Sequence, residues 1–125
     1  DDFVTIALPN GCEFMESCLA VWKAGATPQP ISAKLPKFER DQIIELGQPT
    51  LVVGVEAGEY APVPCLTKGF EPDAALSDAP LPERTAASIK AMTSGGSTGR
   101  PKLIVSKRPG TRSPNISKSR FRGRC

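Results

Sequence analysis

The sequence contains no histidine, and its 125 residues include a single tryptophan and a single tyrosine. Without histidine, a Ser-His-Asp or Cys-His catalytic group is excluded. None of the cysteines forms the Cys-x-x-Cys pair that is typical of zinc sites. We therefore expect no metal-ligating and no catalytic residue in the chain, and we expect free thiols in a reducing cytoplasm. The four cysteines are Cys12, Cys18, Cys65 and Cys125.

Long apolar runs are also missing. No stretch approaches the roughly 20 apolar residues that a membrane-spanning helix needs, so we expect no membrane span. The chain opens with Asp1-Asp2 rather than with an initiator methionine or a basic-apolar leader, which is consistent with the edge of a fragment. The length and the 39% hydrophobic content suit one small soluble domain, and we expect a cytoplasmic protein.

Charge is distributed unevenly along the chain. Residues 1–105 carry nine basic and 13 acidic side chains, whereas residues 106–125 carry seven basic and no acidic ones. The last 20 residues also contain few large apolar groups, so their burial cannot offset the entropy of ordering them. We therefore divide the chain into a domain over residues 1–105 and a basic, disordered tail over residues 106–125.

The first half alternates between strand and helix patterns. An apolar strand over residues 3–8 precedes Asn10, whose spacing to Glu13 predicts a capping box. A helix then runs to about Ala24 and ends at Gly25. We expect Cys12 and Cys18 to fill the core, together with an apolar stripe of Phe14, Met15, Cys18, Leu19, Val21 and Trp22. Stacking of Trp22 on an adenine is the alternative to core packing, and the helical spacing favours packing.

The remaining elements follow from prolines, glycines and short apolar runs. Pro28 and Pro30 place a strand over residues 27–31 at a sheet edge or at a strand end, and Pro36 begins a helix that Gly47 closes. We expect a parallel strand at residues 51–53, a surface loop over residues 54–84 with a short strand around residue 65, and a strand pair at residues 86–92 and 102–105. Charged residues of the second helix are expected to form its solvated face: Lys37, Glu39, Arg40, Asp41 and Glu45.

The stretch between the last two strands has a distinctive chemistry. Residues 94–102 combine three glycines, three hydroxyl residues and a lysine. Glycines let backbone N–H groups line a concave surface that binds anions, while hydroxyl groups and an ammonium group add donors. Because Arg100-Pro101 separates Gly99 from Lys102, this is not a Walker A loop. Composition alone leaves two interpretations open: a phosphate-binding loop and a flexible turn between strands.

Two segments resemble the adenylate-forming acid–CoA ligases, or AMP-binding enzymes. The first is Ser94-Gly95-Gly96-Ser97-Thr98-Gly99-Arg100-Pro101-Lys102, which is similar to that family's Thr-Ser-Gly-Thr-Thr-Gly-x-Pro-Lys signature. Gly95 departs from the signature, because a hydroxyl residue is usual there. The second is Val4–Asn10 with Glu13-Phe14 and Lys23–Ala26, which looks like the opening of the family's large domain. The resemblance covers residues 3–105 and looks most like the fatty-acyl or bile-acid ligase branch.

The resemblance implies an α/β fold. We expect a partial N-terminal subdomain with a mostly parallel sheet and flanking helices, followed by a strand–loop–strand phosphate loop. It also implies that a carboxylic acid and ATP form an acyl-adenylate, which CoA converts to a thioester, with Mg²⁺ bridging the phosphates. The residues it assigns to ATP phosphates are Ser94, Gly95, Gly96, Ser97, Thr98, Gly99 and Lys102.

The resemblance also predicts limits. The family's later acidic residue for magnesium, its acyl pocket and its small C-terminal domain fall outside this chain, so we expect a truncated acid–thiol ligase without activity of its own. The uncovered sheet predicts poor solubility. For residues 106–125, we favour non-family sequence joined after a break in the coding frame. The alternative function is a small nucleotide- or nucleic-acid-binding module that uses this basic tail.

Overall fold

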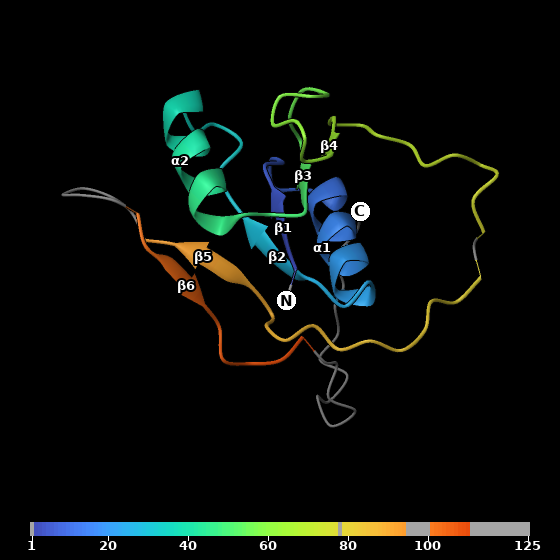
Figure 1. The fold of residues 1–125 in the computed structure, drawn as a ribbon. Helices are drawn as coiled ribbons and strands as arrows, with labels where there is room; N and C mark the ends of the chain where they lie inside the picture. The colour runs from blue at the N-terminus through green and yellow to red at the C-terminus, as the bar shows by residue number, and fades with distance from the viewer. Residues whose placement is uncertain (1, 78, 95–100, 111–125) are drawn as a thin grey trace.

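The structure is a computed structural model that describes residues 2–77, 79–94 and 101–110. Figure 1 shows the order of its elements along the chain. They are β1 (Phe3–Ile6), α1 (Cys12–Lys23), β2 (Thr27–Pro30), α2 (Lys37–Gly47), β3 (Leu51–Val53), β4 (Cys65–Leu66), β5 (Ala91–Thr93) and β6 (Leu103–Val105). In this described part, β1 to β4 form a parallel sheet in the order β2-β1-β3-β4, and β5 and β6 form a separate antiparallel pair. The predicted α/β class with a mostly parallel sheet is confirmed.

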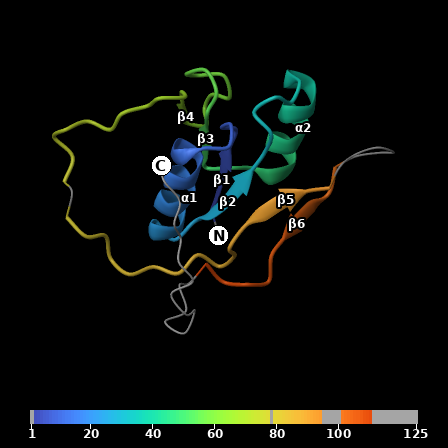
Figure 2. The ribbon, with the colours of Figure 1, turned by 180° about the vertical axis from the view of Figure 1, so that it is seen from behind.

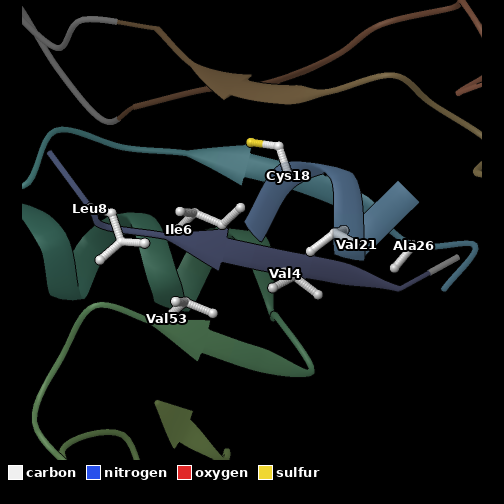
Figure 3. Close-up of a cluster of buried hydrophobic side chains, with 7 residues drawn as sticks. All are labelled: Val4, Ile6, Leu8, Cys18, Val21, Ala26 and Val53. Carbon is white, nitrogen blue, oxygen red and sulfur yellow. The ribbon is translucent and has the colours of Figure 1, made fainter. Parts of the chain in front are cut away.

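Alternating side chains of β1 build a core on each face of the sheet. Val4, Ile6 and Leu8 pack with Cys18 and Val21 of α1, as the close-up in Figure 3 shows. On the opposite face, apolar side chains of the sheet pack against Ile43 and Ile44 of α2. The sheet side chains include those of Ala7, Ile31 and Val52. The two helices lie on opposite faces because the chain leaves β1 in one direction to form β2 and then crosses back past β1 to form β3.

Prolines set the place of β2 at the sheet edge. The N–H groups of Thr27 and Ile31 donate to the carbonyl oxygens of Asp2 and Ile6, over 2.9 Å in both cases. Pro28 and Pro30 alternate with these residues, at positions whose backbone nitrogens face away from β1. Because β2 has no second neighbour in the sheet, the missing donors cost no ladder hydrogen bond. The predicted edge strand is confirmed.

The predicted capping box at the start of α1 is wrong. Gly11 is the N-cap residue, and no side chain caps the helix. The Glu13 carboxylate instead accepts a hydrogen bond of 2.6 Å from the backbone N–H of Gly69. A tertiary contact with the segment after β4 therefore uses the side chain that the local pattern assigned to the cap.

The apolar stripe of α1 is narrower than predicted. Cys18 and Val21 are buried and Phe14 and Trp22 pack against them, whereas Met15 and Leu19 are 40% and 50% exposed. Cys12 is exposed, so its predicted place in the core is also wrong. The helix touches the sheet along one face only, which leaves its flanking apolar positions at the surface.

The end of α2 depends on close packing. The helix includes Gly47 and ends at Gln48, which takes the left-handed conformation with φ of 47°. Gly47 is buried, and a Cβ atom there would lie 2.7 Å from Oε1 of Gln29. A side chain at this position would therefore displace the buried Gln29 amide.

The segment after β4 separates the sheet from the hairpin. Residues 67–77 and 79–85 are exposed, and this segment swings wide of the body in both Figure 1 and Figure 2. The predicted surface loop over residues 54–84 is confirmed from residue 67 on, whereas Val55 is buried in the core under α2. Beyond β6, Ser106, Arg108 and Gly110 exchange backbone hydrogen bonds with Lys90, Ile89 and Ala86. Residues 106–110, which we assigned to the basic tail, thus pair with residues 86–90, and residues 111–125 lie outside the described part. No helix of the described residues is long and apolar enough to cross a membrane.

Candidate functional site

The candidate site is the neck of the loop between β5 and β6. The two strands pair in register, with Met92 opposite Ile104 and Thr93 opposite Leu103. One residue further, the backbone N–H of Ser94 donates to the Lys102 carbonyl oxygen over 2.9 Å. The Lys102 N–H in turn donates to the Ser94 hydroxyl oxygen, also over 2.9 Å. These two hydrogen bonds close the loop at its base.

The structure describes two of the residues that the sequence assigned to phosphate. Ser94 is half-buried at the neck, and Lys102 is exposed opposite it. The other five lie outside the described residues: Gly95, Gly96, Ser97, Thr98 and Gly99. The structure therefore brings together the serine that begins the predicted site and the lysine that ends it.

The side chain of Ser94 has a role that sequence reasoning missed. We predicted it as a hydroxyl donor to phosphate, and in the structure its oxygen accepts the hydrogen bond from the Lys102 backbone. A hydroxyl group has one proton to donate and two lone pairs, so this acceptor role leaves its own proton for another acceptor. The available signal was a hydroxyl residue at the strand end, in front of the glycines, where a side-chain bond to the returning strand can close a turn.

The neck opens beside the carboxyl end of β2. A cavity of about 560 Å³ lies between this end of the sheet, α2 and the neck. Its lining includes Ile31, Phe38, Gln42, Met92, Ser94 and Pro101. Ligands of open parallel α/β sheets bind outside the carboxyl ends of the strands, so the neck stands at the edge of the sheet where a ligand is expected.

A second polar cluster joins α2 to the turn after β3. Arg40 pairs with Glu59 and donates through Nε to the Tyr60 hydroxyl over 2.9 Å. Tyr60 donates to Asp41 over 2.7 Å, and Asp41 also accepts from Lys37 over 2.8 Å. We predicted a solvated charged face here. That prediction is wrong for Arg40, whose side chain is only 18% exposed beside Glu59 and Tyr60, whereas the Asp41 side chain stays 43% exposed.

The cluster also shifts the ionisation of its members. The hydrogen bond from Lys37, followed by that from Tyr60, lowers the pKa of Asp41. Burial, with a smaller contribution from the bond to Asp41, raises the pKa of Tyr60. The hydrogen bond to Tyr60 raises the pKa of Arg40. Each charge has an opposite partner, so the cluster ties α2 to the turn and presents no unpaired acid or base for catalysis.

The described residues offer no metal centre. Within residues 2–77, 79–94 and 101–110, no three His, Cys, Asp or Glu side chains come together to hold an ion.

The fold and the neck define a class of protein. A parallel sheet with helices on both faces, followed by an antiparallel hairpin, is an open α/β scaffold whose ligands are expected at the carboxyl ends of its parallel strands. The sequence model of the AMP-binding enzyme family matches residues 1–110. The chain belongs to the AMP-binding enzymes, the adenylate-forming family.

Relatives of known name or structure span several branches of that family. A probable non-canonical nonribosomal peptide synthetase, CymA of Salinispora arenicola (strain CNS-205), is 30% identical over an alignment 115 residues long, which covers 84% of this chain and 2% of CymA. The o-succinylbenzoate CoA synthetase MenE of Bacillus subtilis, solved with the acyl-adenylate OSB-AMP, has a TM-score of 0.66 at 22% identity. The match covers 82% of this chain and 29% of MenE.

A third relative comes from L. pneumophila. The structure of its fatty acyl-adenylate ligase, in complex with acyl adenylate and pyrophosphate, has a TM-score of 0.63 at 17% identity. The match covers 83% of this chain and 20% of that ligase. The chain thus spans less than a third of the length of each of these three relatives. Likeness at these identities establishes the fold of an N-terminal subdomain.

Proposed function

We propose that this chain supplies the phosphate-binding segment of an acid–CoA ligase, with Ser94 and Lys102 at the neck of the loop that holds the β- and γ-phosphates of ATP. The observation that carries the proposal is the neck itself. Two hydrogen bonds between Ser94 and Lys102 close the loop, the Lys102 side chain remains exposed, and Ser94 lines the cavity beside the carboxyl end of β2. Membership of the adenylate-forming family supports ATP as the nucleotide.

The proposed first step transfers an adenylyl group. A carboxylate oxygen forms a bond to the α-phosphorus of ATP, and the bond from that phosphorus to the bridging oxygen breaks, which releases pyrophosphate. Negative charge grows on the leaving pyrophosphate, so donors already aimed at it lower the barrier. Lys102 would supply an ammonium group and Ser94 its hydroxyl proton. Residues 95–99 would add backbone N–H groups. Mg²⁺ bound with the phosphates would neutralise part of their charge, and we assign no protein ligand to it.

The proposed second step consumes the adenylate. The thiol of CoA attacks the acyl carbonyl, and AMP leaves as the thioester forms. We propose a fatty or bile-acid-like carboxylate because of the Gly95-Gly96-Ser97 start and the Leu103–Val105 end of the motif. A peptide-synthetase adenylation segment, as in the relative CymA, is the alternative within the family. The two differ in the thiol acceptor, which is free CoA in a CoA ligase and a carrier-bound thiol in a peptide synthetase.

Titration with Mg²⁺–ATP tests the phosphate-binding role. We expect Lys102→Ala to weaken ATP binding by about tenfold, because a charge-assisted hydrogen bond contributes about 1.5–3 kcal/mol. Lys90→Ala is the matched control, since Lys90 is an exposed lysine of the same hairpin that lies away from the neck. Calorimetry would show its affinity within about twofold of the parent. Equal affinities for Lys102→Ala and the parent would overturn the proposal.

Product analysis tests the reaction. Since the chain covers less than a third of each of the three relatives described above, we expect the 125 residues alone to form no acyl-CoA. Detection of acyl-CoA by mass spectrometry after incubation with carboxylic acids, ATP and CoA would contradict that expectation.

A nucleic-acid-binding module remains the alternative of a different class. It depends on the seven basic side chains of residues 106–125. It predicts affinity for nucleic acid that falls steeply with salt and disappears when residues 106–125 are removed. Salt-independent or absent binding in a fluorescence titration would exclude it.

A further inference from the structure

Buried polar side chains line one half of a sheet face. Thr5, Thr27 and Gln29 are fully buried, and the register of β1 and β2 places them on the face that α2 covers, where the Gln29 amide lies against Gly47. Thr5 donates to Oε1 of Gln29 over 2.8 Å. The neighbouring half of this face is apolar and packs with α2. Buried polar groups need hydrogen-bond partners, so the Thr27 hydroxyl requires a covering layer that supplies an acceptor.

The base of the β5–β6 hairpin is the end far from the neck, where residues 86–90 pair with residues 106–110. This base supplies part of that layer. Thr27 donates to the carbonyl oxygen of Ser88 over 3.3 Å, and Ser88 is 1% exposed. The Ser88 hydroxyl lies 2.9 Å from the Lys90 carbonyl oxygen and 2.7 Å from that of Ser106. Its single proton is thus placed between the two arms of the hairpin, which are residues 86–94 and 102–110, and Thr27 joins the first arm to β2.

Trp22 reaches the same base from α1. Its indole Nε1 donates to the carbonyl oxygen of Ile89 over 2.7 Å. A Cβ atom on Gly110 would lie 3.2 Å from Cδ1 of the ring, which places the ring against the returning arm as well. The arms are bonded to each other here, because Ile89 donates to Arg108 and Gly110 donates to Ala86. Trp22 therefore contacts both arms.

Beyond this base, Ala91 of β5 is fully buried, whereas the larger apolar side chains of the hairpin are exposed and do little to orient it. Met92 is 46%, Ile104 57% and Val105 41% exposed. The contacts that hold the base are hydrogen bonds to carbonyl oxygens, which act on the backbone itself. A change of angle at the base would move the neck, because β5 connects Ser88 to Ser94 within a few residues.

We propose that Trp22, Thr27 and Ser88 are positioning residues, which set the angle of the β5–β6 hairpin on the sheet and hold the Ser94–Lys102 neck beside the end of β2. The inference rests on the proposed function in one respect: the neck must be the base of the phosphate-binding loop. These residues touch no substrate. They act on phosphate binding through the backbone of the hairpin.

Amide hydrogen exchange tests the inference without a ligand. Trp22→Phe keeps a benzene ring and loses the pyrrole ring that carries the N–H donor. In Thr27→Val the hydroxyl is lost, whereas Thr27→Ser keeps it. We expect exchange at the Ser94 and Lys102 amides to accelerate by about fivefold in Trp22→Phe and Thr27→Val, which is the factor for one lost hydrogen bond. The Ala7 amide, which donates to Val53 within the sheet, is the internal reference and should change less than about twofold.

Controls separate positioning from a general loss of stability. Leu19→Ala alters the exposed side of the same helix and should leave the Ser94 and Lys102 amides as in the parent. Thr27→Ser should also behave as the parent. Equal acceleration at Ala7, Ser94 and Lys102 would overturn the inference, because it would indicate global destabilisation. Unchanged exchange at the neck in both Trp22→Phe and Thr27→Val would overturn it too.

Mg²⁺–ATP titration of the same variants links the inference to function. We expect affinity to fall by about fivefold in Trp22→Phe, in step with the exchange at the neck. If Lys102→Ala weakens binding and Trp22→Phe does not, the positioning inference fails while the proposed function stands. If the parent chain binds no ATP, the proposed function fails, and the exchange experiment still decides whether Trp22 and Thr27 position the neck.

Discussion

In the four-stranded sheet, Ile6 and Val52 are completely buried, whereas in the β5–β6 hairpin Met92, Ile104 and Val105 are each more than 40% exposed. The sheet is thus held by apolar side chains on both faces. The hairpin is held at its base by side chains of α1 and β2 that donate to its backbone. This difference suits two tasks, because burial favours a rigid scaffold and a hairpin anchored at one end leaves its far end accessible to a ligand.

Truncation of one isoleucine in each region should separate the two modes of stabilisation. Ile6→Ala removes a fully buried side chain between β2 and β3, and we expect a loss of about 3–5 kcal/mol in the free energy of unfolding. Ile104→Ala alters a side chain that is 57% exposed and should cost less than about 1 kcal/mol. Urea unfolding followed by circular dichroism measures both. Similar losses would mean that the hairpin is packed as tightly as the sheet.

Two glycines test how closely the strands of the sheet approach each other. Gly54 follows β3 with φ of 90°, and a Cβ atom there would lie 2.5 Å from the backbone oxygen of Ala7. Gly58 has φ of 79° and no atom within 4 Å of such a Cβ. Both substitutions by alanine incur the cost of a left-handed conformation, about 1–2 kcal/mol.

Gly54→Ala should cost about 2 kcal/mol more than Gly58→Ala, because backbone atoms must also move apart. Thermal unfolding of the two variants measures the difference. If Gly54→Ala and Gly58→Ala lose the same free energy of unfolding, the backbone around Gly54 adjusts to the extra atom. The sheet would then be less rigid than its contrast with the hairpin implies.

The smallest expected effect concerns pH and the surface of α2. Interactions with Lys37 and Tyr60 lower the pKa of Asp41, so the folded state favours the ionised carboxylate. The resulting stability is present above the unfolded pKa of about 3.9 and is lost as the pH falls through the lower folded pKa. We expect Asp41→Asn to reduce this loss of stability below about pH 4. The control is Tyr60→Phe, which keeps the ion pair with Lys37 and should retain most of the dependence.

Urea unfolding at a series of pH values from 7 to 3 measures the acid dependence of each variant. If the free energy of unfolding falls equally between pH 7 and pH 3 in Asp41→Asn and the parent, the hydrogen bonds to Asp41 do not stabilise the folded state. Because the side chains of Lys37 and Asp41 are exposed by 63% and 43%, the effect should also shrink as salt is added.

Local patterns predicted the elements well. Apolar runs located β1 and β3, and the prolines of β2 placed it at the edge. Glycines and hydroxyl residues marked the loop between β5 and β6, whose neck the structure describes at Ser94 and Lys102. These features depend on backbone preferences over a few residues, which a sequence states directly.

Contacts between distant segments were not predictable in the same way. Glu13 binds the backbone of Gly69 instead of capping its own helix, and Arg40 is covered by Glu59 and Tyr60. Trp22 was predicted as core packing, and in the structure it packs against the core and also donates to Ile89. Each of these roles depends on a partner at least 19 residues away, which no periodic pattern specifies.

By itself the sequence determined which segments form strands and helices, that β2 lies at an edge, and that a phosphate-type motif joins two strands. The tertiary structure alone decided where the hairpin sits, since its position depends on carbonyl oxygens that every residue possesses. Every residue has a backbone carbonyl, so the residue type does not show which carbonyl oxygen accepts a hydrogen bond. The acceptors of Trp22, Thr27 and Ser88 could therefore be identified only from the folded structure.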